Sequence, residues 1–113
     1  MAEIPSAEAV SLFSKWARQN SNLAVLGSNS SAVVSVRNAR VSLCLDDLLQ
    51  LSFAGDGIMR LFIRGALFAP ADPRDFPEDS MAWSAQCNPG IQIRFANAEM
   101  LCFLFPEREI KPA

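Results

Sequence analysis

The chain of 113 residues offers few side chains that could do chemistry, and histidine is absent. Histidine is the usual general base near neutral pH and the commonest metal ligand, so the sequence holds no Ser-His-Asp or Cys-His device. The three cysteines, Cys44, Cys87 and Cys102, are too few for a four-cysteine zinc site and show no Cys-x-x-Cys spacing. We interpret them as free thiols of a reducing, cytoplasmic compartment. Cys87, in a predicted loop, is the candidate reactive thiol, although nothing near it in the sequence would activate it.

Carboxylates are the next candidates for chemistry. Four acids gather in one short segment, at Asp72, Asp75, Glu78 and Asp79. Their spacing does not follow a calcium-binding loop, and catalysis by two of them would require a cleft and a raised pKa. Gly55-Asp56-Gly57 lacks the Gly-Lys-Ser ending of a phosphate loop and lies between two predicted strands. We therefore predict a protein that is not an enzyme and that binds neither a metal nor a cofactor.

The positive charges are mostly arginine, and the net charge of −2 argues against nonspecific nucleic-acid binding. Arg60 and Arg94 fall at polar positions of two predicted strands. Our prediction is that the acids of the 72–79 segment fold over the sheet and pair with them. The alternative is that Arg60 and Arg94 contact an anionic ligand, either a carboxylate or a phosphate.

An amphipathic helix is predicted over residues 6–20, with Ser6 as its N-cap and Glu8 in its first turn. Its apolar residues recur at steps of three and four and form one stripe: Ala9, Val10, Leu12, Phe13, Trp16 and Ala17. From residue 23 the apolar period changes to two, which predicts antiparallel strands over 23–69 and 91–105. These elements indicate a single α+β domain, in which the helix packs on a curved antiparallel sheet of about five to seven strands. Such a sheet can curl into a partly open barrel.

Two hairpins of similar sequence, 49–63 and 91–105, dominate the predicted sheet, and Asn38-Ala39 is predicted to be a further turn. Residues 70–90 form an acidic, proline-rich connection, and residues 107–113 are predicted to be a frayed tail. Alternation assigns one face of the hairpins to the core: Leu49, Leu51, Phe53, Met59, Leu61, Ile63, Ile91, Ile93, Phe95, Leu101, Phe103 and Phe105.

The opposite face is polar in part, but it also carries Ile58, Phe62, Met100, Cys102 and Leu104. The last strand, 100–105, is therefore apolar on both faces, whereas an antiparallel strand usually keeps one polar face. Leaving several large apolar side chains in water would forfeit much of a domain's stability. The second face must be covered by the 70–90 segment or by a second copy of the protein.

We therefore expect a small intracellular module that forms a homodimer or docks on another protein. The predicted interaction residues are Phe76, Met81, Trp83, Met100 and Leu104. The alternative is a small-ligand binding protein whose pocket between helix and sheet takes an anionic or apolar ligand. No apolar run approaches 18 residues and no secretory signal is visible, so we expect neither a membrane span nor a leader.

Overall fold

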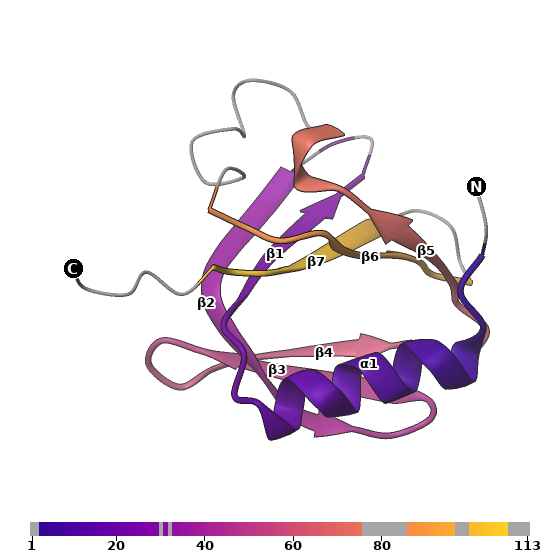
Figure 1. Cartoon of the computed structure of the whole chain (residues 1–113), viewed down its shortest axis with the longest axis horizontal. Helices are drawn as coiled ribbons and strands as arrows, with labels where there is room; N and C mark the ends of the chain where they lie inside the picture. Colours follow the sequence, from indigo (N-terminus) through magenta and orange to yellow (C-terminus); the bar gives the residue numbers. More distant parts are fainter. Residues whose placement is uncertain (1–2, 30, 32, 76–85, 97–99, 109–113) are drawn as a thin grey trace.

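The computed structural model describes residues 3–29, 31, 33–75, 86–96 and 100–108. Within these ranges the chain forms one α-helix, one short 3-10 helix and seven strands (Figure 1). In chain order they are α1 (Ser6–Arg18), β1 (Leu23–Ser28), β2 (Val33–Cys44), β3 (Leu48–Phe53), β4 (Gly57–Phe62), β5 (Leu67–Ala71), η1 (Pro73–Asp75), β6 (Gly90–Arg94) and β7 (Leu101–Pro106). The predicted α+β class is confirmed, and α1 is not long and apolar enough to cross a membrane.

Helix α1 has the amphipathic character that its sequence predicts, with Ala9, Phe13 and Trp16 buried. Its N-cap position is held by Pro5 and makes no side-chain capping bond, so the prediction that Ser6 is the cap is wrong. The helix ends two residues earlier than predicted, because Asn20 adopts a left-handed backbone conformation with φ of 51°. Asparagine tolerates this conformation better than most residues do.

The seven strands form one antiparallel sheet in the order β4-β3-β2-β1-β7-β6-β5. The long strand β2 belongs to both halves of this sheet: residues 33–39 pair with β1, and residues 40–44 pair with β3. Figure 1 shows the two halves curving toward each other. Helix α1 packs against β2, where Sγ of Cys44 lies 3.9 Å from the carbonyl of Val10, and it also contacts β5. The sheet does not close, because β4 and β5 remain as its two edges.

The turn predicted at Asn38-Ala39 is wrong, because β2 continues through both residues. Leu23 of β1 pairs with Ala39, and Val25 pairs with Val36, so β2 advances by three residues where β1 advances by two. Asn38 lies in this interval and has a φ of 60°. This is a β-bulge, which bends a strand and increases its twist. The bulge allows β2 to curve from one half of the sheet to the other, with Ala39 fully buried.

Alternation predicts the buried face of the first hairpin correctly, because Leu49, Leu51 and Leu61 are buried in the core. Alternation fails in β7. Ile91 and Ile93 of β6 face the core, and their cross-strand partners in β7 are Leu104 and Cys102. Cys102 and Leu104 therefore face the main core, and the prediction that they lie on the outer face is wrong. A shift of one residue exchanges the two faces of a strand, and a strand that is apolar on both sides gives no pattern to prevent it.

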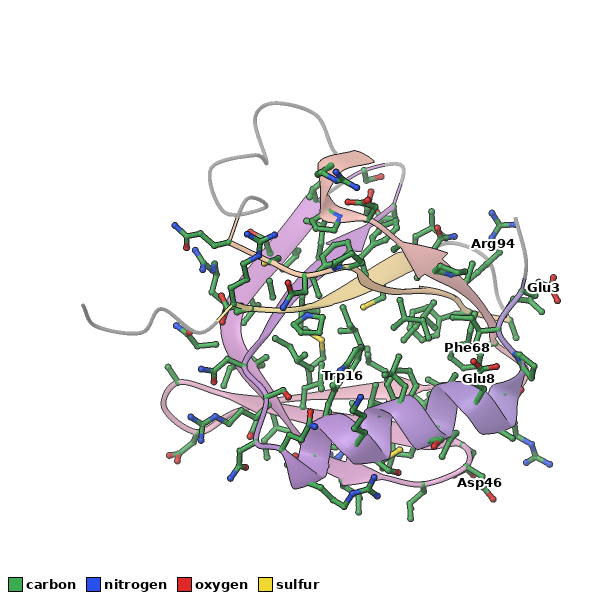
Figure 2. All side chains as sticks on the ribbon, viewed as in Figure 1. Glu3, Glu8, Trp16, Asp46, Phe68 and Arg94 are labelled. Carbon is green, nitrogen blue, oxygen red and sulfur yellow. The ribbon has the colours of Figure 1, made fainter. Side chains whose placement is uncertain are left out.

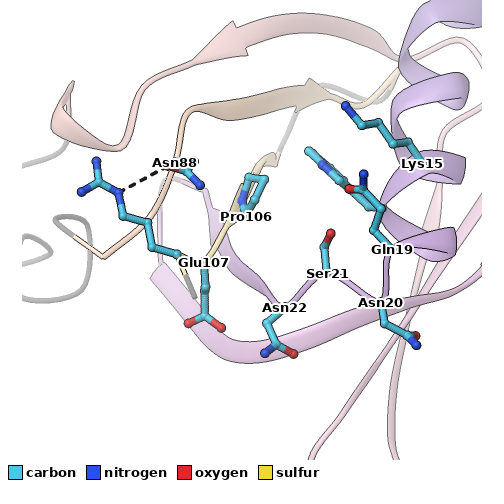
Figure 3. Close-up of a pocket in the computed structure, with 10 residues that line it drawn as sticks. Lys15, Gln19, Asn20, Ser21, Asn22, Asn88, Pro106 and Glu107 are labelled. Carbon is cyan, nitrogen blue, oxygen red and sulfur yellow. Dashed lines mark hydrogen bonds between the residues drawn. The ribbon is translucent and has the colours of Figure 1, made fainter. Parts of the chain in front are cut away.

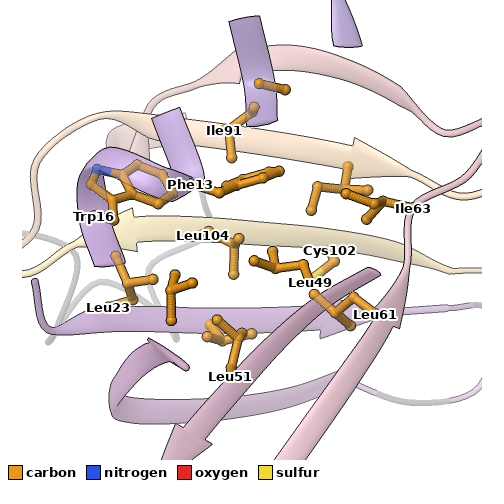
Figure 4. Packing of buried hydrophobic residues seen from close by; sticks show 14 of the residues in the cluster. Phe13, Trp16, Leu23, Leu49, Leu51, Leu61, Ile63, Ile91, Cys102 and Leu104 are labelled. Carbon is orange, nitrogen blue, oxygen red and sulfur yellow. The ribbon is translucent and has the colours of Figure 1, made fainter. Parts of the chain in front are cut away.

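The core fills the space between α1 and the curved sheet, and all seven strands contribute to it (Figures 2 and 4). A smaller apolar cluster of Ala24, Cys87 and Phe105 lies on the other side of β1 and β7, with Ala71 and Phe103 packed against it. Strand β7 is thus buried on both sides, as its sequence predicts. Cys87 and Ala71 come from the 70–90 segment and form part of the predicted cover, whereas residues 76–85 lie outside the described residues.

Candidate functional site

Strand β4 presents an unpaired edge. The N–H of Ile63 donates to the carbonyl of Asp47 at 3.0 Å, so the residues of β4 at odd positions face β3. Bonded and non-bonded pairs alternate along an antiparallel ladder, so the N–H and C=O groups of Ile58, Arg60 and Phe62 point away from β3. No strand of the described chain pairs with this side of β4. Three residues therefore offer backbone hydrogen-bonding groups to another strand.

The side chains of the same residues form an exposed, largely apolar surface. Phe62 is 71% exposed and Ile58 is 54% exposed, both on the sheet face opposite the core. Leu48 lies directly across from Phe62 on β3 and continues the apolar surface. We call Leu48, Ile58, Arg60 and Phe62, together with the free backbone groups beside them, the β4 surface. Single exposed apolar residues are common, but apolar side chains on an unpaired strand favour association.

Arg60 is the charged residue at the centre of the β4 surface, and it is held back across β3. Its Nε donates to Oε1 of Gln50 at 2.9 Å. The amide nitrogen of Gln50 in turn donates to Oγ of Ser42 on β2 at 3.2 Å. These contacts draw the guanidinium away from the free edge and leave the backbone of β4 accessible.

The other edge of the sheet is protected by two features. The N–H of Ile4 donates to the carbonyl of Phe68 on β5 at 2.8 Å, so the segment before α1 covers part of this edge. Strand β5 also contains Pro70, which has no N–H to donate. Natural sheets protect edges by such means, whereas β4 has neither a covering segment among the described residues nor a proline.

The residues predicted for interaction lie elsewhere. Met100 is exposed just before β7, but Leu104 is 0% exposed in the main core and cannot contact a partner. Phe76, Met81 and Trp83 lie outside the described residues. The sequence did place Ile58 and Phe62 on the outer face, but strand order alone reveals that their strand is an edge.

Arg60 and Arg94 are not brought together by the fold. They lie on β4 and β6, which are separated by four strands of the sheet. Within the described ranges neither makes an ion pair with an acid. Asp72 binds its neighbour Arg74 at 2.8 Å instead, and the hydrogen bonds from Arg74 lower the pKa of this carboxyl. The side chain of Asp75, together with Glu78 and Asp79, lies outside the described residues.

Glu107 forms an ionic contact that the sequence did not indicate. Its side chain is 7% exposed and accepts a hydrogen bond from Nε of Arg37 at 2.6 Å. Its second oxygen accepts the N–H of Asn38 at 3.2 Å, and Arg37 also donates to Oε1 of Gln86 at 3.1 Å. The carboxylate thus joins the bulge of β2 to the end of β7, and the prediction that the frayed tail begins at residue 107 is wrong.

The three cysteines are free thiols. Cys87, predicted to be the most reactive, is 2% exposed, so this prediction is wrong. Burial raises the pKa of the Cys87 thiol, and the nearby Glu107 carboxylate raises it further. Burial also raises the pKa of Cys102, to about 12. Among the described residues, no group of three acidic or cysteine side chains could hold a metal ion.

Comparisons with known proteins leave the function to be argued from geometry. No protein-family model, curated protein or solved structure was found to match this chain.

Proposed function

We propose that the protein is an interaction module that acts by binding rather than catalysis, and that two copies associate by pairing their β4 edges. The observation that supports this proposal is the coincidence of free backbone groups and exposed apolar side chains on Ile58 and Phe62. Adding a strand to a sheet edge is a common mode of recognition, in which backbone bonds supply affinity and alternate side chains supply specificity.

The sequence of this region is self-complementary under two-fold antiparallel pairing centred on Arg60. Ile58 then lies opposite Phe62 of the second copy, which creates two apolar cross-strand pairs. Asp56 and Arg64 lie in the turns just outside β4, so the same register brings Asp56 of one copy near Arg64 of the other at each end. The register forms about six backbone hydrogen bonds. Cross-strand apolar and opposite-charge pairs each contribute about 0.2–1 kcal/mol.

Arg60 would lie opposite its own copy in this register, which is unfavourable for two like charges. Its hydrogen bond to Gln50 reduces that cost because the guanidinium leans across its own sheet. Replacing Arg60 by glutamine removes the repulsion and is therefore expected to tighten the dimer. The flanking Asp56–Arg64 pairs argue for a second copy as the occupant, because one sequence supplies both partners of each pair.

The test is the mass of the chain in solution, measured by light scattering over a concentration series in the micromolar range. The proposal predicts a concentration-dependent rise from the monomer mass of 12.3 kDa toward twice that value. A mass that stays at the monomer value throughout would contradict self-association. A complex of another stoichiometry would contradict two-fold pairing.

We also propose that the protein works in a reducing compartment such as the cytoplasm. The three free thiols, two of them buried, support this. Thiol titration of unfolded protein purified without reductant should find three free thiols per chain, whereas a disulfide would contradict the proposed compartment.

A further inference from the structure

A polar pocket of about 430 Å³ lies between the C-terminal end of α1 and the ends of β1 and β7 (Figure 3). Its volume is within the range of small-molecule sites. The helix supplies Lys15 and Trp16, and the chain just beyond it supplies Gln19 and Ser21. Asn88 and Arg108 line the opposite side.

Trp16 provides the most specific sign of a ligand. The residue is 5% exposed, yet within the described chain its indole N–H makes no hydrogen bond. No side-chain nitrogen sealed from solvent lacks a partner among the described residues, so this N–H must open onto accessible space. Trp16 lines the pocket, and a largely buried tryptophan usually finds an acceptor for its N–H. The pocket therefore contains an accessible donor that has no acceptor within the described chain.

On the side of the pocket formed by Asn88 and Glu107, the side-chain acceptors are already used. Oδ1 of Asn88 accepts Nε of Arg108 at 3.3 Å, which leaves the NH₂ group of Asn88 free to donate. Both carboxylate oxygens of Glu107 are bonded to the bulge of β2. Figure 3 shows the polar ends of Lys15 and Asn88 approaching the hollow from different sides.

The charges of the pocket favour an anion. Lys15 and Arg108 are both exposed cations, whereas Glu107 is neutralised by its ion pair with Arg37. The last carbonyls of α1 are partly negative, and three of them, those of Lys15, Trp16 and Ala17, accept the N–H groups of Gln19, Ser21 and Asn20. Charge-assisted hydrogen bonds from ammonium and guanidinium groups to carboxylate or phosphate are among the strongest in proteins.

We propose that this pocket binds a small organic molecule bearing a carboxylate or phosphate group. One acceptor of the ligand receives the indole N–H of Trp16, and its anionic group lies between Lys15 and the Asn88–Arg108 pair. This site is independent of the β4 surface, because none of the residues that line the pocket belongs to β3 or β4.

The test follows the indole N–H directly in ¹⁵N-labelled protein. The chain has two tryptophans, so the spectrum contains two indole signals, and a Trp83→Phe variant assigns them. Succinate, citrate and inorganic phosphate are titrated to about 10 mM at constant ionic strength, with glucose as a neutral probe. The proposal predicts a saturable downfield shift of the Trp16 signal with a carboxylate or with phosphate, and no shift with glucose.

Matched variants complete the experiment. Lys15→Gln and Arg108→Gln are each expected to weaken binding about tenfold, since each loses one charge-assisted contact. Arg18→Gln removes an exposed cation of the same helix that does not line the pocket, and should leave affinity unchanged. The proposal is overturned if no anion gives saturation, if glucose alone shifts the signal, or if Arg18→Gln weakens binding as much as the two pocket variants do.

Discussion

Replacing Phe62 by serine should separate the two copies while leaving the single chain folded. The ring is 71% exposed in the isolated chain, so its removal deletes little packing there. Complete burial of a large apolar side chain contributes about 1.5–3 kcal/mol. Burying the exposed part of Phe62 on association would therefore contribute about 1–2 kcal/mol for each copy. With two copies in the dimer, the loss is about 2–4 kcal/mol, which weakens association about 30- to 700-fold.

Sedimentation equilibrium of the wild-type and Phe62→Ser chains measures this change, and thermal unfolding checks that the variant remains folded. The matched control is Leu67→Ser, which removes an apolar side chain that is 51% exposed on the protected β5 edge. The control should dimerise like the wild type. The reasoning is refuted if Phe62→Ser dimerises normally, or if Leu67→Ser weakens the dimer equally.

Further predictions concern the fold itself. Gly90→Ala should lower the free energy of unfolding, measured by urea titration, by about 1–3 kcal/mol, because a Cβ there would collide with a backbone carbonyl of β7. The control is Gly27→Ala, whose Cβ would meet only ordinary contacts and which should be tolerated. Glu107→Gln should lower the free energy of unfolding by about 1.5–3 kcal/mol, because it removes a charged hydrogen bond to a nearly buried carboxylate. Asp72→Asn changes an exposed ion pair and should leave the melting temperature unchanged. Burial raises the folded pKa of Cys102 to about 12, so the unfolded chain loses this proton first as the pH rises above about 9, and stability falls. Between about pH 8 and pH 10, urea titrations should show a loss about 1.4 kcal/mol larger in the native chain than in Cys102→Ala, and equal losses would refute the assignment.

The sequence predicts what depends on local periodicity. The helix stripe from Ala9 to Trp16 and the alternation in the first hairpin identify the core correctly, since α1 and β3 each have one apolar face and one largely polar face. Strand β7 lacks that contrast, so its two faces are exchanged in the prediction. The bulge at Asn38 escapes notice because its left-handed conformation also suits the turn that was predicted there.

The candidate sites depend on contacts between distant parts of the chain, which one sequence does not reveal. Ile58 and Phe62 become significant because β4 is an edge, and strand order determines that. Glu107 meets Arg37 across 70 residues of chain. The donors of the pocket gather only because the end of α1 lies near the end of β7, so that Trp16 and Asn88 line the same pocket.

The most direct test of β4 pairing is an isotope-filtered NMR experiment on a mixture of labelled and unlabelled chains. Two-fold pairing centred on Arg60 places the Hα atoms of Met59 and Leu61 of opposite copies close together, as in a non-bonded antiparallel pair. The account predicts an intermolecular signal between these two atoms at concentrations where the dimer forms. Intermolecular signals confined to another surface, or their absence from a sample of dimeric mass, would contradict it.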